Sequence, residues 1–174
     1  MKIRTANPND LDDLYEFYAE VIDQQPFDEY GAGWTKDVYP SMEDLKRHIE
    51  EDIFYLGLID EKIVCAIAVC LKEDEAYKAG DWKLKLADDQ IAVLHLFGVA
   101  PEYRGRGLSL KMLNFIKEDL RSKVKAIHLD VVKGNKRAFK MYEKAGFEHI
   151  GELSVYYEDT GDIIVDLFEY DYKK

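Results

Sequence analysis

Apolar positions along the chain follow two periods, one typical of helices and one typical of strands. Apolar residues three or four apart predict amphipathic helices over about 8–23, from 41 onwards, over 108–123 and over 135–145. Short apolar runs predict strands at 3–5, 54–59, 62–70, 91–100, 126–132, 149–156 and 163–170. The predicted order is therefore β-α-α-β-β-β-α-β-α-β-β.

This order predicts the fold class. Alternating strands and helices indicate an α/β domain, here with a mixed, mostly antiparallel sheet and one parallel pair around the helix at 108–123. The strands at 54–59 and 62–70 are separated by two residues, which indicates a hairpin. A length of 174 residues suits one domain that spans 1–174.

Composition narrows the class of partner. The formal net charge of -11 argues against nucleic acid, which requires a basic surface. It mildly favours a cationic small substrate, although solubility alone is the simpler explanation of the charge. No apolar run approaches the ~18 residues of a membrane span, and the first residues lack the apolar stretch of a signal peptide. We expect a cytoplasmic protein without a membrane or metal partner, since the 4 histidines and 2 cysteines show no metal-binding spacing.

A turn rich in glycine and arginine follows the strand at 91–100. It reads Arg104-Gly-Arg-Gly-Leu-Ser109 and leads directly into a predicted helix. A helix N-terminus offers unpaired N–H groups and a positive dipole end, and glycines let the backbone wrap around an anion. The turn therefore predicts a phosphate or pyrophosphate site, the alternative being a simple strand-to-helix connection. It matches neither a dinucleotide-binding nor a P-loop pattern.

Two motifs carry a resemblance to a known family. Arg104-x-x-Gly107-x-Ser109 resembles the Q/R-x-x-G-x-G/A signature of the GNAT superfamily of N-acetyltransferases, with serine at the last position in place of glycine or alanine. The segment 135–147 is similar to the family's later N-x-x-A-x-x-x-Y-E-x-x-G-F helix. The resemblance implies a GNAT-like fold with splayed central strands and acetyl-CoA as co-substrate.

The resemblance also implies which residues contact the cofactor. Backbone amides of the turn are expected to bind the pyrophosphate, and the strand before it to pair with the pantetheine arm. The later helix adds further contacts. The residues concerned are Arg104, Gly105, Arg106, Gly107, Leu108 and Ser109 in the turn, Phe97, Gly98 and Val99 in the strand, and Asn135, Ala138 and Tyr142 in the helix segment.

Two residues are candidates for catalysis. By the motif match, Tyr142 is expected to protonate the departing thiolate, although it could simply pack on its helix. His95 is an ionisable residue of the predicted strand whose chemistry suits proton transfer, and some related amine acetyltransferases carry histidine there. A core role for His95 and water chains to Glu20, Asp28 or Glu29 are the alternatives. The Val99 amide is the candidate oxyanion donor.

The acceptor is less defined. The family places its acceptor site in segments that correspond to 24–40 and 72–90, where Trp34 and Tyr39 are candidate contacts for an amine. We expect an N-acetyltransferase that acts on a small primary amine. A protein N-terminal or lysine acetyltransferase and a catalytically silent acyl-CoA sensor are the alternatives. The strand at 163–170, if it is an exposed edge, would allow a homodimer.

Overall fold

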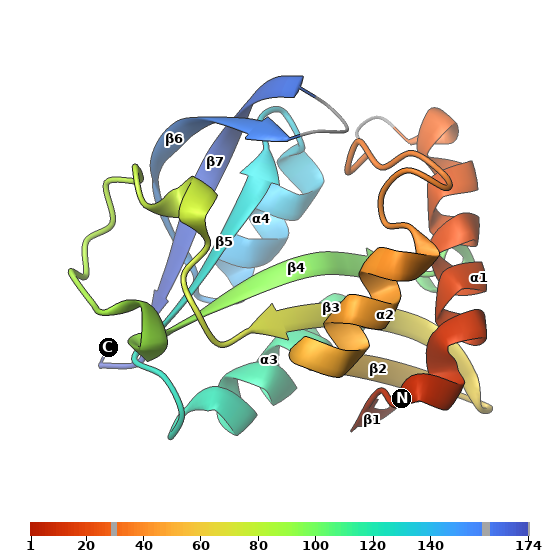
Figure 1. Cartoon of the computed structure of the whole chain (residues 1–174). Helices are drawn as coiled ribbons and strands as arrows, with labels where there is room; N and C mark the ends of the chain where they lie inside the picture. Colours follow the sequence, from red (N-terminus) through yellow and green to blue (C-terminus); the bar gives the residue numbers. More distant parts are fainter. Residues whose placement is uncertain (29–30, 158–160, 174) are drawn as a thin grey trace. The chain divides into compact units, whose positions relative to one another are not determined.

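The computed structural model describes residues 1–28, 31–157 and 161–173 (Figure 1). Its described strands form a sheet in the hydrogen-bonded order β1-β2-β3-β4-β5-β7-β6. The order along the chain confirms the predicted mixed α/β fold. The elements are β1 (Lys2–Thr5), α1 (Leu11–Gln24), α2 (Met42–Glu51), β2 (Ile53–Ile59), β3 (Lys62–Cys70), β4 (Ile91–Val99), α3 (Leu108–Leu120), β5 (Ala126–Val132), α4 (Lys136–Lys144), β6 (Glu148–Tyr157) and β7 (Gly161–Asp171).

The residues cluster into two compact units. The first comprises Met1–Val69 and His95–Met112, and the second comprises Cys70–Leu94 and Leu113–Lys174. The expectation that residues 1–174 act as one domain stays a prediction.

Side-chain caps explain where the first two helices begin. The Asn7 side chain accepts a hydrogen bond from the Asn9 amide at the start of a short 3-10 turn that leads into α1. At α2, the Ser41 hydroxyl accepts from the Asp44 amide while the Asp44 carboxylate accepts from the Ser41 amide. Such reciprocal caps satisfy amides that have no partner within the helix.

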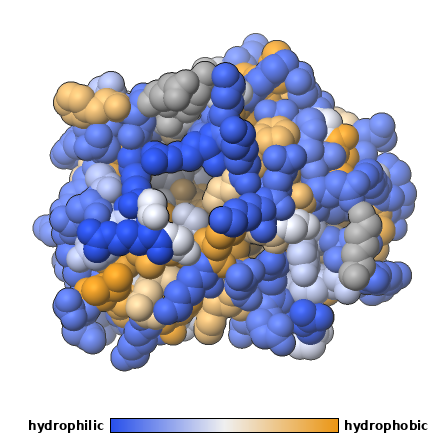
Figure 2. Space-filling view, turned by 180° about the vertical axis from the view of Figure 1, so that it is seen from behind, coloured by the Kyte–Doolittle hydropathy of each residue, from blue (hydrophilic) through white to orange (hydrophobic). Residues whose placement is uncertain are grey.

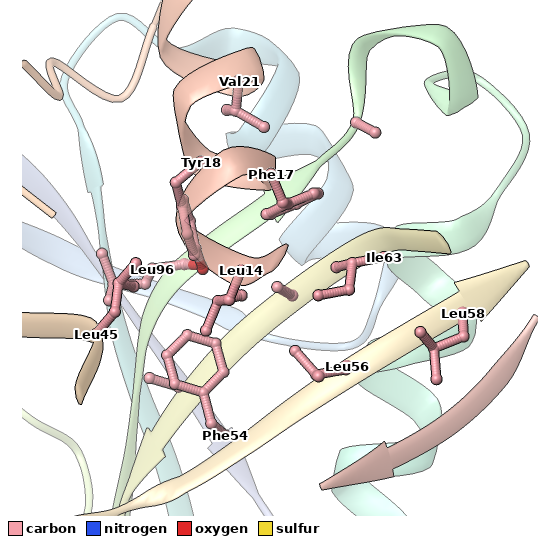
Figure 3. Close-up of a cluster of buried hydrophobic side chains, with 13 residues drawn as sticks. Leu14, Phe17, Tyr18, Val21, Leu45, Phe54, Leu56, Leu58, Ile63 and Leu96 are labelled. Carbon is pink, nitrogen blue, oxygen red and sulfur yellow. The ribbon is translucent and has the colours of Figure 1, made fainter. Parts of the chain in front are cut away.

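A hydrophobic core fills the first unit (Figure 3). Helices α1 and α2 lie side by side over the antiparallel β1-β2-β3 strands (Figure 1). Their inward residues, among them Leu14 on α1 and Leu45 on α2, are fully buried against Leu56 of β2. This packing fixes the position of α1. Side chains of α1 contact the end of β4 that belongs to the same unit.

In the second unit, β7 lies in the middle of three antiparallel strands. It pairs with β5 on one side, from Ala126↔Asp171 to Val132↔Val165, and with β6 on the other. The expectation that the strand at 163–170 is an exposed edge is therefore wrong, because the sequence pattern cannot distinguish an edge strand from a doubly paired one. The start of β4 pairs in parallel with β5 over Ile91–Val93.

A buried polar cluster holds the segment before β4 against the rest of the second unit. The His128 ring is fully buried, with Nδ1 2.7 Å from Glu73 Oε2 and Nε2 3.1 Å from Glu169 Oε2. Trp82 stacks on this ring at 3.6 Å between centroids and donates its indole N–H to the Tyr77 carbonyl. Three residues of the segment 72–90, expected at the acceptor site, are therefore buried within their own unit (Glu73, Tyr77 and Trp82), while the rest of the segment is half-buried or exposed.

The surface agrees with the composition. The face shown in Figure 2 is mostly hydrophilic, with apolar side chains scattered among charged ones. Among the helices of the described residues, none is both long and apolar enough to cross a bilayer.

The β2–β3 turn allows a test of local backbone strain. Asp60 and Glu61 have φ of 50° and 60°, the left-handed conformation that matches the twist of a two-residue hairpin but disfavours side chains with a Cβ. We expect Glu61→Gly to raise the free energy of unfolding by about 0.5 kcal/mol, since relief of the strain exceeds the entropic cost of glycine. Urea denaturation measures the change. As a control, Glu50→Gly in α2 should lower it by about 1 kcal/mol; a destabilised Glu61→Gly would contradict the prediction.

Candidate active site

A local distortion of β4 lies at the centre of the candidate site. Leu96 has φ of 56°, an uncommon conformation for a residue with a side chain. The buried Tyr18 hydroxyl of α1 donates a hydrogen bond to the Leu96 carbonyl (Figure 3). Burial raises the pKa of Tyr18 well above its usual value, so its hydroxyl remains protonated and available as a donor. Residues 95–99 therefore follow a bend that α1 holds in place.

Gly98 lets α1 approach β4 closely. A Cβ on Gly98 would lie 3.1 Å from Phe17 Cε1 and 3.5 Å from Tyr18 Cε1. These contacts are tighter than, or at the limit of, ordinary van der Waals distances, so a side chain at this position would push the helix away.

The end of β4 presents alternate residues to the two sides of the strand. Leu96 and Gly98 are buried, whereas His95, Phe97 and Val99 are half-buried. The predicted base His95 and the predicted oxyanion donor Val99 therefore share the more accessible side.

The turn after β4 is open, as an anion site requires. Gly105 and Gly107 have φ of 76° and 75°, and a Cβ on either would meet no atom within 4 Å. The first bond of α3 runs from the Lys111 amide to the Gly107 carbonyl, so the amides of residues 108–110 begin the helix. Free space, a glycine backbone and a helix N-terminus together fit a pyrophosphate.

The arginine side chains of the turn bond to protein groups. Arg104 Nη1 lies 2.6 Å from Asp28 Oδ2, and Arg104 Nε donates to the Val99 carbonyl at 3.2 Å. Arg106 donates to the Glu102 carbonyl at 3.0 Å and lies over the Tyr103 ring. The Arg104 side chain thus braces the turn, which leaves the backbone amides as the expected ligands.

The alternative bases have different surroundings. The Asp28 carboxylate is engaged in an ion pair with Arg104. Glu20 lines an open pocket of about 350 Å³ and lies 3.7 Å from Lys62 Nζ, while Glu29 lies outside the described residues.

The remaining predicted cofactor residues belong to the second unit. Asn135 is the N-cap of α4 and accepts a hydrogen bond from the Ala138 amide at 3.1 Å. Tyr142 is 6% exposed and packs against Phe147 and Phe168. Gly146, with φ of 89°, follows the C-cap residue Ala145, directly after the helix predicted over 135–145. Both roles weighed for Tyr142 are compatible with this environment, because the ring packs even if the hydroxyl reacts.

The two candidate acceptor residues pack against the core of the first unit. Trp34 lies edge-on to Tyr18, with ring centroids 5.5 Å apart, and its backbone is held by the Gln25 side chain. Tyr39 is partly buried against the same core. Both rings therefore shape the segment between α1 and α2.

One group near His95 was missed by sequence reasoning. His48, on the last turn of α2, lies 2.6 Å from Asp52 Oδ2, and its ring centroid is 6.4 Å from that of His95. The spacing of four residues between His48 and Asp52 was a usable signal, but His48 also fitted the apolar stripe of its helix.

Comparison with known proteins identifies the family. Residues 14–147 match the model of the acetyltransferase (GNAT) family. The chain belongs to this family. Membership confirms the predicted resemblance and places the chain in a family of acetyltransferases.

Two curated relatives of this GNAT chain are moderately similar. An uncharacterized N-acetyltransferase of Methanocaldococcus jannaschii is 27% identical over 150 residues, or 84% of this chain and 60% of that protein. N-alpha-acetyltransferase 60 of Xenopus tropicalis is 28% identical over 169 residues, or 93% of this chain and 65% of that protein. The chain therefore spans less than two thirds of the length of either relative.

A solved structure confirms the GNAT fold. The crystal structure of Arabidopsis thaliana NAA60 in complex with acetyl-CoA has a TM-score of 0.71 with this chain and is 16% identical, covering 99% of both chains. At this identity the likeness concerns the fold.

The Tyr18–Leu96 bond generates a prediction. Tyr18→Phe leaves a buried carbonyl without its donor, which should lower the free energy of unfolding by about 1–3 kcal/mol and lower activity as the bend relaxes. Tyr15→Phe is the matched control, since its hydroxyl bonds to Asp37 at the surface and its loss should change stability by less than about 0.5 kcal/mol. Chemical denaturation measures the free energy of unfolding of both variants. Equal losses would show that the buried hydrogen bond contributes no more stability than the exposed one.

Proposed function

We propose that the chain transfers the acetyl group of acetyl-CoA to a primary amine. The open turn at the start of α3, where Gly105 and Gly107 adopt positive φ with free space around them, is the observation that carries the proposal. The backbone amides of residues 104–109 would bind the pyrophosphate, and those of Phe97–Val99 the pantetheine arm. By the motif match, Asn135 and Ala138 add contacts.

The chemistry requires three tasks. The acceptor amine must lose a proton before its nitrogen attacks the thioester carbonyl, and His95 is the proposed base. Negative charge that develops on the carbonyl oxygen needs a donor, for which we propose the Val99 amide. The C–S bond then breaks, and Tyr142 is the proposed proton donor to the thiolate, because the phenol is protonated at neutral pH.

Two acceptor classes have support. The acidic net charge of -11 favours a small cationic amine. A protein N-terminus is the second candidate, since the Xenopus tropicalis relative is named an N-alpha-acetyltransferase. A silent sensor, the remaining alternative, would bind acetyl-CoA without turnover.

A panel of amines distinguishes these classes. The protein is incubated with acetyl-CoA and spermidine, lysine, an aminoglycoside or a short peptide with a free N-terminus, and thiol release is followed. Release with at least one amine supports the proposal, and the preferred amine identifies the acceptor class. Binding of CoA without release on any amine would favour the sensor.

The phosphate turn can be tested apart from catalysis. Gly107→Ala places a Cβ at φ of 75° in the turn and should weaken CoA binding about tenfold or more, as measured by calorimetry. Gly161→Ala is a matched control, because Gly161 has φ of 71° and equally open surroundings at the start of β7. The Gly161→Ala variant should lower the free energy of unfolding by a similar amount and leave the affinity for CoA unchanged. If both variants bind CoA as the parent does, the turn is not the phosphate site.

The role of Tyr142 is tested by removing its hydroxyl. Tyr142→Phe keeps the packing against Phe147 and Phe168, so we expect kcat to fall about 100-fold while the KM for acetyl-CoA is nearly constant. Steady-state kinetics with the most active amine provide the measurement. An unchanged kcat would assign the residue to packing alone.

A further inference from the structure

Helix α4 concentrates positive charge on its exposed side. The helix has 9 residues, in a chain whose formal net charge is -11. Its basic face consists of four exposed side chains, Lys136, Arg137, Lys140 and Lys144. In the part of the chain that the structure describes, none of the four forms an ion pair, whereas the nearby Lys133 lies 2.7 Å from Glu152 Oε2.

This arrangement is unfavourable for the helix itself. Lys136 and Arg137 occupy the first turn, where the positive end of the helix dipole repels cations. The spacing of four residues from Lys136 to Lys140 and from Lys140 to Lys144 makes like charges neighbours on the surface. Helices α1 and α2 instead carry two acidic residues each in their first turns. The basic face therefore lowers the stability of α4, which indicates a role outside the fold.

The basic face lies on the other side of α4 from the residues that the motif match assigns to acetyl-CoA. These are Asn135, Ala138 and Tyr142. Successive residues of a helix are rotated by about 100°, which groups these three on one side and the four cations on the opposite side. Burial agrees, because Tyr142 is 6% exposed and Ala138 is half-buried, whereas the cations are exposed. The donor site therefore does not account for the charge.

A groove of about 430 Å³ adjoins the basic face within the second unit. Lys136, Lys140 and the half-buried ring of Phe139 contribute to its lining. Two of its three carboxylates, Glu152 and Asp166, already contact a lysine or a histidine. The groove thus offers an aromatic surface beside unpaired lysines, which fits a peptide that carries both acidic and apolar side chains.

Charge complementarity selects an anionic partner, and the size of the basic face limits its kind. A helix of this length extends about 14 Å, which matches about four residues of an extended peptide. Charges more than about 8 Å away are largely screened at physiological ionic strength, so a short acidic segment interacts mainly with the basic face. A long RNA or an anionic membrane would also meet the acidic remainder of the surface, which repels it.

We propose that the basic face of α4 docks an acidic segment of a protein partner. Acidic side chains of the partner lie against Lys136, Arg137 and Lys140, and an apolar neighbour enters the groove beside Phe139. The partner's carboxylates thereby offset the repulsion among the cations. Docking involves no covalent step and does not depend on acetyl transfer, so the proposal goes beyond the proposed function.

A labelled peptide measures docking separately from catalysis. The probe is a dye-labelled, N-acetylated peptide that is rich in glutamate and has a central leucine. The comparison peptide has glutamine in place of each glutamate. Because the N-terminus is blocked, the probe cannot accept an acetyl group. Fluorescence anisotropy at low salt should show about tenfold tighter binding of the glutamate peptide, with the difference shrinking as salt is added.

Charge reversal on the helix separates docking from stability. Lys136→Glu, Arg137→Glu and Lys140→Glu should each weaken binding of the glutamate peptide about fivefold. The first two place a carboxylate at the positive end of the helix dipole, so we expect an equal or higher melting temperature. Lys125→Glu is the matched control, since Lys125 is an exposed lysine of the same unit, directly before β5. It changes the net charge equally and should keep the parent affinity.

Several results would overturn the proposal. Equal affinity for the two peptides would remove its basis, and an equal loss in Lys125→Glu would reduce the effect to net charge. A lower melting temperature in the first-turn variants would assign the cations to structure, and weaker CoA binding, measured by calorimetry, would assign them to the donor site. Tighter binding of oligouridylate RNA or of phosphatidylserine vesicles, lost in the same variants, would replace the peptide by that class of partner.

Discussion

The hydrogen bond from the Tyr18 hydroxyl to the Leu96 carbonyl is the interaction on which the candidate site depends. A leucine with φ of 56° costs about 1–2 kcal/mol of backbone strain, so the conformation needs external support. Tyr18 provides it from a fully buried position on α1. Because Phe17 of the same helix also contacts Gly98, the packing of α1 positions the strand residues that face the chemistry.

Charged pairs attach the less regular segments to this frame. Arg104 joins the turn after β4 to Asp28, just beyond α1, and also holds the Val99 carbonyl. In the second unit, His128 lies between Glu73 and Glu169, and both carboxylates are almost fully buried. A carboxylate oxygen therefore lies within hydrogen-bond distance of each nitrogen of this buried ring. Pairing allows such charges to be buried in the interior of an acidic protein.

Local patterns predicted most of the fold. Helical and strand periods, the Ser41 cap and the C-terminal Gly146 are encoded within a few residues, so the element order followed directly from the sequence. The glycine turn and the segment 135–147 likewise indicated the family and its acyl donor. Contacts between distant residues were not predictable: Tyr18 with Leu96, Arg104 with Asp28, and β7 between β5 and β6. His48 was hidden for a related reason, since a polar residue on an apolar stripe resembles core until its partners are known.

The most direct test of the central claim, that the bent end of β4 and the following turn bind the acyl donor, is a backbone amide NMR titration with CoA. The account predicts the largest shift changes at the amides of residues 97–99 and 105–109, saturating with CoA concentration. Saturable binding that leaves these amides unchanged and shifts others would contradict it.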